Sequence, residues 1–286
     1  MRGRLARLLA PLALGACAVG PQPSRVTLDE FRALQTPRLL DLVRVLETPS
    51  NRERRTILKA VLDDRAIAYR AEAYSLDGGH GENLVFEVGG GPRTVIFTAH
   101  HDVRPGSPGA NDDASCIASI LAAHERLRRD PPRGLRVRFI IFDGEERTRE
   151  GSRAYVRSRD MSDVIGVYSY ELCGMGRRIN VWDVVRPELR ETEIFRALAA
   201  ALEEARLPHV VRGRVGLASS DHESFMKLDP RVPGFGVTIL PDGVISQLRP
   251  FRHYHRPTDL AATLEEQAMQ TMADLIHRTV RRLEGR

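Results

Sequence analysis

The sequence has few cysteines and contains no serine-hydrolase motif. Its three cysteines, Cys17, Cys116 and Cys173, are too few for a disulfide scaffold and too scattered for a zinc finger. The apolar run near the N-terminus, residues 8–16, is far shorter than the roughly 20 residues that cross a bilayer as a helix. No Gly-x-Ser-x-Gly sequence occurs, so a serine hydrolase finds no support. These absences exclude several classes of protein and name no activity.

Lysine is almost absent, although the chain is basic. Lys59 and Lys227 are the only lysines among 43 basic residues, and the 38 acidic residues leave a formal charge of +5. An excess of basic over acidic residues is typical of proteins that bind nucleic acid or anionic lipid. The arginines of residues 126–138, however, straddle a predicted helix end, a Pro-Pro turn and a strand start without interleaved aromatic residues. This pattern favours a solvated face, and we expect no nucleic-acid partner.

The first residues have the pattern of an export signal. Three arginines (Arg2, Arg4 and Arg7) precede the apolar run, and small residues end it. Leu14-Gly15-Ala16-Cys17 resembles the bacterial lipoprotein cleavage box, which implies removal of residues 1–16 and lipidation of Cys17. Such an anchor places the protein in the bacterial cell envelope, facing the periplasm, and Ala18 favours the outer membrane. The alternatives are a plain signal peptide or a retained apolar N-terminus.

The rest of the chain is predicted to form one α/β domain, residues 28–286, after a tether over residues 17–27. Its 42% hydrophobic and 28% charged residues are typical of a globular protein. Apolar spacing predicts helices over 38–47 and 51–63, around 117–127, and from Thr263, where Glu266 would complete a capping box. Apolar runs predict strands near 83–88, 94–99, 137–142, 164–170 and 234–240. Buried strands alternating with helices indicate a three-layer α/β/α sandwich around a mostly parallel mixed sheet.

A glycine run, Gly89-Gly90-Gly91-Pro92, lies between the first two predicted strands. A phosphate-binding loop needs a helix N-terminus after it, and here a strand follows. We therefore expect a hairpin turn at this point.

Acidic residues and histidines gather where the predicted strands end. Such ends form the ligand sites of open α/β sheets. The residues concerned are His100, Asp102, Asp112, Asp113, Glu145, Glu146, Glu171 and His255. Carboxylates brought together in this way repel one another unless a cation lies between them. Carboxylates mixed with imidazoles, without a thiolate cluster, suit catalytic zinc or a related transition metal.

Five motifs occur in the order and spacing of one enzyme family. They are Thr98-Ala99-His100-His101-Asp102, Gly109-Ala110-Asn111-Asp112-Asp113-Ala114-Ser115, Glu145-Glu146, Gly151-Ser152, and His255-Arg256-Pro257-Thr258-Asp259. Over about residues 50–280 the chain resembles the co-catalytic two-zinc aminopeptidases, of the bacterial leucyl aminopeptidase and aminopeptidase Y kind. The resemblance implies a zinc-dependent exopeptidase that hydrolyses N-terminal residues from peptides with two Zn²⁺ per chain.

The resemblance also implies a role for each residue. Asp112 would bridge the metals, His100 and Glu171 would complete one site, and Glu146 and His255 would complete the other. Asp102 would accept a hydrogen bond from His100 and fix the orientation of that ring. Glu145 would be the general base that takes a proton from metal-bound water and delivers it to the leaving amine. Ser220-Asp221-His222 resembles a segment near the substrate pocket, which makes Asp221 and His222 candidate substrate contacts beside a loop-packing alternative.

Three departures from the family pattern bear on the site. Glu171 stands where aspartate is usual, Thr148-Arg149 replaces a glycine-leucine pair, and Cys116 replaces a glycine. Cys116 and Cys173 either form a disulfide in an oxidising envelope or remain two buried thiols.

Two other functions remain open at this stage. Glutaminyl cyclases share this fold and use a single zinc, and their glutamate pair often occurs in the string found here, Phe142-Asp143-Gly144-Glu145-Glu146. Against that reading, those cyclases carry an insertion before the following Gly-Ser, and this chain has none. The other alternative is a non-catalytic peptide-binding lipoprotein.

Overall fold

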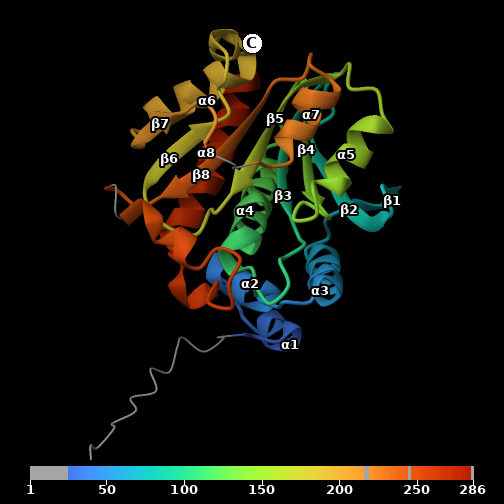
Figure 1. The fold of residues 1–286 in the computed structure, drawn as a ribbon, viewed down its shortest axis with the longest axis vertical. Coiled ribbons are helices and arrows are strands. Elements are labelled where there is room, and N and C mark those ends of the chain that lie inside the picture. The colour runs from blue at the N-terminus through green and yellow to red at the C-terminus, as the bar shows by residue number, and fades with distance from the viewer. Residues whose placement is uncertain (1–24, 216–218, 244–245, 285–286) are drawn as a thin grey trace, which may run out of the picture.

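The computed structural model describes residues 25–215, 219–243 and 246–284, and its eight-stranded sheet lies between two layers of helices (Figure 1). The predicted signal peptide, Cys17 and residues 18–24 of the predicted tether lie outside the described residues. Within the described part of the chain, no helix is both long and apolar enough to cross a membrane.

The sheet has the strand order β1-β2-β4-β3-β5-β8-β6-β7. The strands are β1 Tyr69–Leu76, β2 Gly79–Val88, β3 Arg93–His100, β4 Leu135–Phe142, β5 Val164–Glu171, β6 Arg178–Trp182, β7 His209–Val211 and β8 Gly234–Leu240. The four central strands, β4, β3, β5 and β8, run parallel to one another. β2 and β6 flank them in antiparallel orientation. The predicted mixed, mostly parallel sheet is confirmed.

Helices cover both faces of the sheet. They are α1 Leu28–Arg32, α2 Leu39–Leu46, α3 Asn51–Asp64, α4 Ser115–Arg129, α5 Glu150–Arg157, α6 Glu193–Glu204, α7 His222–Leu228 and α8 Glu266–Glu284. α2, α4, α6 and α8 pack together on one face, and α5 packs against α7 on the other (Figure 1). The predicted helices and strands are all present, whereas strands β1, β6 and β7 and helices α1, α5, α6 and α7 were not predicted.

The central strands β3, β4 and β5 supply apolar side chains to both helical layers. In β3, Val95 and Phe97 join the larger core, which contains α4 and α8, while Ile96 joins the smaller core under α5 and α7. Successive side chains of a strand point to opposite faces, so a strand buried on both sides needs an unbroken apolar run. The continuous runs in the sequence therefore identified the buried centre of the sheet.

The hairpin predicted at Gly89-Gly90-Gly91-Pro92 is wrong. β2 and β3 do not pair with each other, because β4 lies between them and pairs with both. The glycines allow the chain to cross β4 closely: a Cβ on Gly91 would lie 2.0 Å from the backbone of Gly134, which precedes β4. The tight backbone approach, rather than a hairpin or a phosphate, accounts for the run.

The capping box predicted at Thr263 and Glu266 is also wrong. Thr263 lies in a 3₁₀ turn and donates its hydroxyl to the Leu260 carbonyl (2.7 Å). The Glu266 carboxylate instead accepts the backbone N–H groups of Leu39 (3.0 Å) and Leu40 (2.8 Å), at the start of α2. Glu266 thus caps a different helix, a contact across 227 residues that local spacing cannot reveal.

Candidate metal centre

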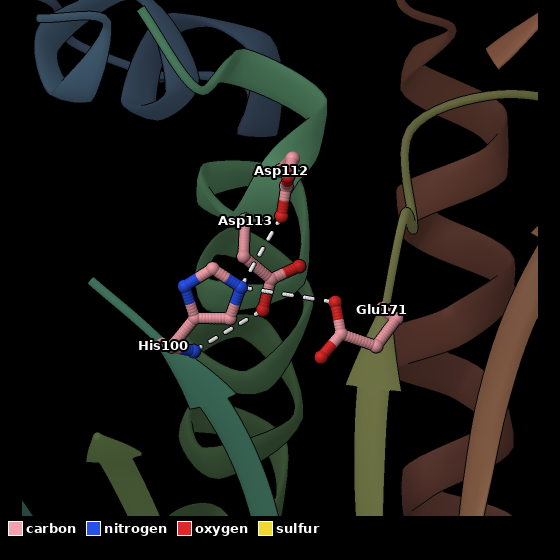
Figure 2. A group of neighbouring side chains, drawn as sticks. All are labelled: His100, Asp112, Asp113 and Glu171. Atoms are coloured by element: carbon pink, nitrogen blue, oxygen red, sulfur yellow. Dashed lines mark hydrogen bonds and ion pairs between the residues drawn. The ribbon is translucent and has the colours of Figure 1, made fainter. Parts of the chain in front are cut away.

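Three neighbouring parallel strands bring the predicted residues to one edge of the sheet. β3 ends at His100 and β5 ends at Glu171, while Glu145 and Glu146 follow β4 after two residues. Parallel strands end on the same side, so these side chains meet there. Asp112 reaches the same point from the turn before α4 (Figure 2).

The first cluster lies around the ring of His100. Its Nε2 is 3.2 Å from Asp112 Oδ1 and 3.7 Å from Glu171 Oε2 (Figure 2). Asp113 belongs to the same cluster, and its Oδ2 accepts the backbone N–H of His100 (3.2 Å). Ser220 donates its hydroxyl to Glu171 Oε1 (2.6 Å), which leaves the other oxygen of Glu171 facing His100.

The second cluster shares Asp112 with the first. His255 Nε2 lies 3.1 Å from Asp112 Oδ2 and 3.1 Å from Glu146 Oε1. Asp112 therefore offers one carboxylate oxygen to each cluster, as a residue bridging two ions would. Although burial opposes protonation of His255, the two carboxylates raise the pKa of its imidazole to about 9.

Asp102 supports the glutamate pair more directly than it supports His100. Its carboxylate accepts the backbone N–H groups of Glu145 (3.0 Å) and Glu146 (3.1 Å). The Nδ1 atom of His100 lies 3.0 Å from the Asp102 backbone carbonyl and 3.6 Å from its carboxylate. The hydrogen bond predicted from His100 to the Asp102 side chain is thus made to the main chain.

Glu145 lies among several other negative charges. Burial raises the pKa of Glu145 well above its usual range, and Glu171, Asp221 and Asp102 raise it further, against the opposite effect of His100. A divalent cation bound between these carboxylates would offset their negative charge and favour the ionised form of Glu145. The clusters offer carboxylate oxygens and imidazole nitrogens, and the candidate ligand atoms of each cluster lie within 4.8 Å of one another. This donor set fits zinc.

The predicted substrate contacts Asp221 and His222 have different surroundings. Asp221 is buried, and its burial raises its pKa to about 7, with a further contribution from Glu171. The His222 ring is fully buried, with Nε2 2.9 Å from Asp183 Oδ2 and an edge-on contact with Trp182. His222 therefore packs against the sheet, whereas Asp221 lies close enough to the metal centre to affect its charges.

Tyr254 belongs to the site, although sequence reasoning did not single it out. Its ring stacks on His255 at 3.6 Å between centroids. Burial raises the pKa of Tyr254 above its ordinary value, and the charges of Asp112, Glu171, Glu146 and Glu145 raise it further. Its position next to His255 in the chain was the one available signal, and adjacency alone does not show which way a side chain points.

A buried arginine supports the segment that holds Asp112. Arg54, on α3, is fully buried; its guanidinium donates to the carbonyls of Leu46 (3.0 Å) and Gly109. The carboxylates of Asp259, Asp113, Asp112 and Asp102 act on this charge and offset part of its burial cost. The sequence offered no signal for this role, because Arg54 lies among other arginines on an ordinary helix.

Cys116 and Cys173 are adjacent beneath the centre. Both are buried and free in this structure, with their sulfur atoms 2.7 Å apart. The Cys173 N–H also donates to the Ser115 hydroxyl (3.0 Å), which ties the turn after β5 to the start of α4.

Two curated proteins are similar to parts of this chain. A probable lipoprotein aminopeptidase of Mycobacterium tuberculosis, LpqL, is 34% identical over 84 residues, which cover 29% of this chain and 17% of that protein. Aminopeptidase YwaD of Bacillus subtilis is 25% identical over 189 residues, which cover 65% of this chain and 40% of that protein. The matches thus span less than half the length of either relative.

Solved structures share the fold at low sequence identity. LapA of Legionella pneumophila superposes with a TM-score of 0.70 at 20% identity, covering 87% of this chain and 73% of that chain. A glutaminyl cyclase from an Acidobacteriales bacterium superposes with a TM-score of 0.68 at 15% identity, covering 98% of this chain and 99% of that chain.

The family comparison agrees with the motifs and with the geometry of the two clusters. The model of Peptidase family M28 matches residues 83–280, which include every predicted metal ligand. The chain belongs to Peptidase family M28.

Proposed function

We propose that this protein is a two-zinc aminopeptidase that removes N-terminal residues from peptides. The observation that carries the proposal is the position of Asp112, whose two oxygens face His100 and His255 separately. Glu171 would complete the first zinc site and Glu146 the second. The aminopeptidase names of LpqL and YwaD support the same activity.

Several residues around the zinc ions would have separate roles in the reaction. Bound zinc supplies a water molecule of lowered pKa and polarises the carbonyl of the scissile peptide. Glu145 would accept a proton from the attacking water and pass it to the leaving amine. Asp102 holds the backbone of Glu145 in place through its 3.0 Å hydrogen bond. The Tyr254 hydroxyl, whose pKa is raised by burial and by the surrounding carboxylates, would donate to the developing oxyanion.

We further propose that the protein works in the bacterial cell envelope. The basic and apolar start of the sequence, followed by Cys17, supports lipidation and a membrane anchor facing the periplasm. The probable lipoprotein status of LpqL supports the same location. Metabolic labelling with a radioactive fatty acid tests it: label should enter the wild type and be absent from Cys17→Ser.

Metal content and hydrolysis test the activity together. We expect about two zinc ions per chain and hydrolysis of leucine-p-nitroanilide that a chelator abolishes and added Zn²⁺ restores. Glu145→Gln should keep both ions and lose hydrolysis by at least a hundredfold. A metal-loaded, folded protein that hydrolyses no N-terminal residue from a broad peptide panel would contradict the proposal and favour a peptide-binding lipoprotein.

Glutaminyl cyclisation is the second candidate. The string Phe142-Asp143-Gly144-Glu145-Glu146 and the nearly full-length superposition on the Acidobacteriales cyclase favour it. A cyclase of this kind would hold one zinc and convert an N-terminal glutaminyl peptide to its pyroglutamyl form. One ion per chain with cyclisation and no peptide hydrolysis would replace the aminopeptidase by this function.

A further inference from the structure

The segment that contains His255 carries an unusual surface beside the metal centre. Residues 246–256, called here the 246–256 segment, contain two 3₁₀ turns, Ser246–Leu248 and Pro250–Arg252. Leu248 and Phe251 are 58% and 46% exposed. Phe251 contacts Tyr254 edge-on at 6.1 Å, and Tyr254 stacks on His255. The exposed surface of the segment is thus continuous with the candidate ligand.

The positive charges of this segment have no acidic partners. Arg249, Arg252 and Arg256 are exposed, and within the described residues their side chains form no ion pair or hydrogen bond. The flanking acids are occupied: Asp242 pairs with Arg178 at 2.9 Å, and Asp259 is buried against backbone N–H groups. Residues 243–258 contain no aspartate or glutamate.

A further arginine, Arg104, contacts the second cluster. Arg104 lies in the loop after β3, its side chain is 49% exposed, and its Nε is 2.9 Å from Glu146 Oε2. Arg104 therefore borders the candidate ligand Glu146, and the unpaired arginines belong to the segment that carries the candidate ligand His255.

We propose that the 246–256 segment, with Arg104, selects peptides that carry acidic residues just after the cleaved N-terminal residue. This inference rests on the proposed aminopeptidase function. An extended peptide advances about 3.3 Å per residue, so its second to fourth residues lie within roughly 10 Å of the reacting bond. Guanidinium groups pair with carboxylates in a bidentate geometry, and Phe251 and Leu248 offer apolar contact to the aliphatic part of such side chains.

The occupant is a peptide rather than an anionic membrane because of where the segment lies. His255 belongs to this segment and is also a candidate metal ligand. A molecule bound to the 246–256 segment would therefore lie beside the scissile bond. A substrate extends across that position, whereas a membrane pressed against it would cover the metal centre.

Matched tripeptides test the proposal. Leu-Glu-Glu-amide, Leu-Gln-Gln-amide and Leu-Lys-Lys-amide differ only in the charge that follows the N-terminal leucine. We expect the wild type to show a lower KM for the acidic peptide than for the neutral one, with similar kcat. The difference in KM should be only about tenfold, because each exposed ion pair contributes little binding free energy. The preference should shrink as NaCl is raised from 50 to 500 mM.

The variant Arg249→Gln/Arg252→Gln should remove most of the difference in KM and leave leucine-p-nitroanilide hydrolysis unchanged. Arg133→Gln/Arg157→Gln is the matched control, since it removes two exposed, unpaired arginines near the opposite edge of the sheet. The control should keep the acidic preference. Equal KM values for the acidic and neutral peptides in the wild type, or an undiminished preference in the Arg249→Gln/Arg252→Gln variant, would overturn the proposal.

Two further measurements separate this inference from its alternatives. Calorimetric titration of the three tripeptides into Glu145→Gln measures charge preference without turnover, so loss of the preference and loss of the activity can be told apart. Sedimentation with phosphatidylglycerol vesicles tests the membrane: vesicle binding that requires Arg249 and Arg252, without any charge preference among the peptides, would assign the segment to lipid and overturn the peptide proposal.

Discussion

The carboxylate of Asp259 accepts the backbone N–H of Asp112 at 3.1 Å, across 147 residues of sequence. Its other oxygen accepts the N–H of Asn111 at 2.8 Å, and its own carbonyl accepts the N–H of Ala110. Asp259 lies four residues after His255, so this contact fixes the two candidate ligand segments relative to each other. The position of the shared ligand Asp112 therefore depends on the loop that supplies His255.

Removing one of these acceptors should weaken metal binding. Asp259→Asn keeps one side-chain oxygen and presents an amide N–H₂ to a backbone N–H, so one of the two hydrogen bonds is lost. Groups that orient metal ligands commonly contribute 10–100-fold to metal affinity, and we expect about a tenfold loss for zinc. Competition with a fluorescent zinc chelator measures it. Asp242→Asn, the same change at the surface, should retain wild-type affinity, and an equal loss in both variants would contradict the prediction.

Arg54→Met should destabilise the whole fold. The change leaves the carbonyls of Leu46 and Gly109 without their donor and removes the positive charge that compensates the buried aspartates. We expect a decrease of about 2–4 kcal/mol in the free energy of unfolding, measured by urea denaturation of the metal-free protein. Arg52→Met, on an exposed position of the same helix, should cost less than about 0.5 kcal/mol. Similar values for the two variants would show that Arg54 has no such role.

His124 should make the stability depend on pH between 6.5 and 4. It is 3% exposed and packs edge-on against Phe86 and Phe139, with ring centroids 5.1 and 5.6 Å away. Burial, together with Arg128, lowers the pKa of His124 to about 4. Between its folded and unfolded pKa values the unfolded chain binds more protons, so stability falls as the pH falls through this range.

The loss attributable to His124 is about 3 kcal/mol, since one pKa unit corresponds to about 1.4 kcal/mol. Urea denaturation at pH 7 and pH 4 measures the difference. His124→Leu should have a smaller difference between the two pH values than the wild type. If both proteins lose the same stability, the acid sensitivity arises elsewhere.

Cys116 and Cys173 should form a disulfide when the protein refolds with oxidised glutathione. Their sulfur atoms are neighbours in the folded chain, and the bond would close a loop between residues 57 positions apart. Loop closure of this length predicts a gain of about 4 kcal/mol in the free energy of unfolding. Mass spectrometry of a non-reduced digest identifies the linked peptides. Cys173→Ala should show neither the link nor the gain; refolded wild type with two free thiols would favour the reduced pair.

The fold class and most of the metal centre could be predicted from local patterns. Continuous apolar runs identify strands buried on both faces because each face of the sheet meets a helical layer. Because β4, β3 and β5 are parallel, their carboxyl ends lie on one side of the sheet, and because they are also neighbours in it, His100, Glu146 and Glu171 come together there. Motif order and spacing added the identity of the family, which the match over residues 83–280 confirms.

Only the tertiary structure decided which partners each polar group acquired. Glu266 caps α2 rather than its own helix, Asp102 binds the amides of the glutamate pair, and His222 turns to Asp183. Local sequence does not specify these partners, because the choice depends on which buried polar groups the packed chain leaves without another partner. The sequence determines the covalent order and spacing of the residues. Which partner a buried polar group has, and what it would cost to leave that group unpaired, depend on neighbours from distant parts of the chain.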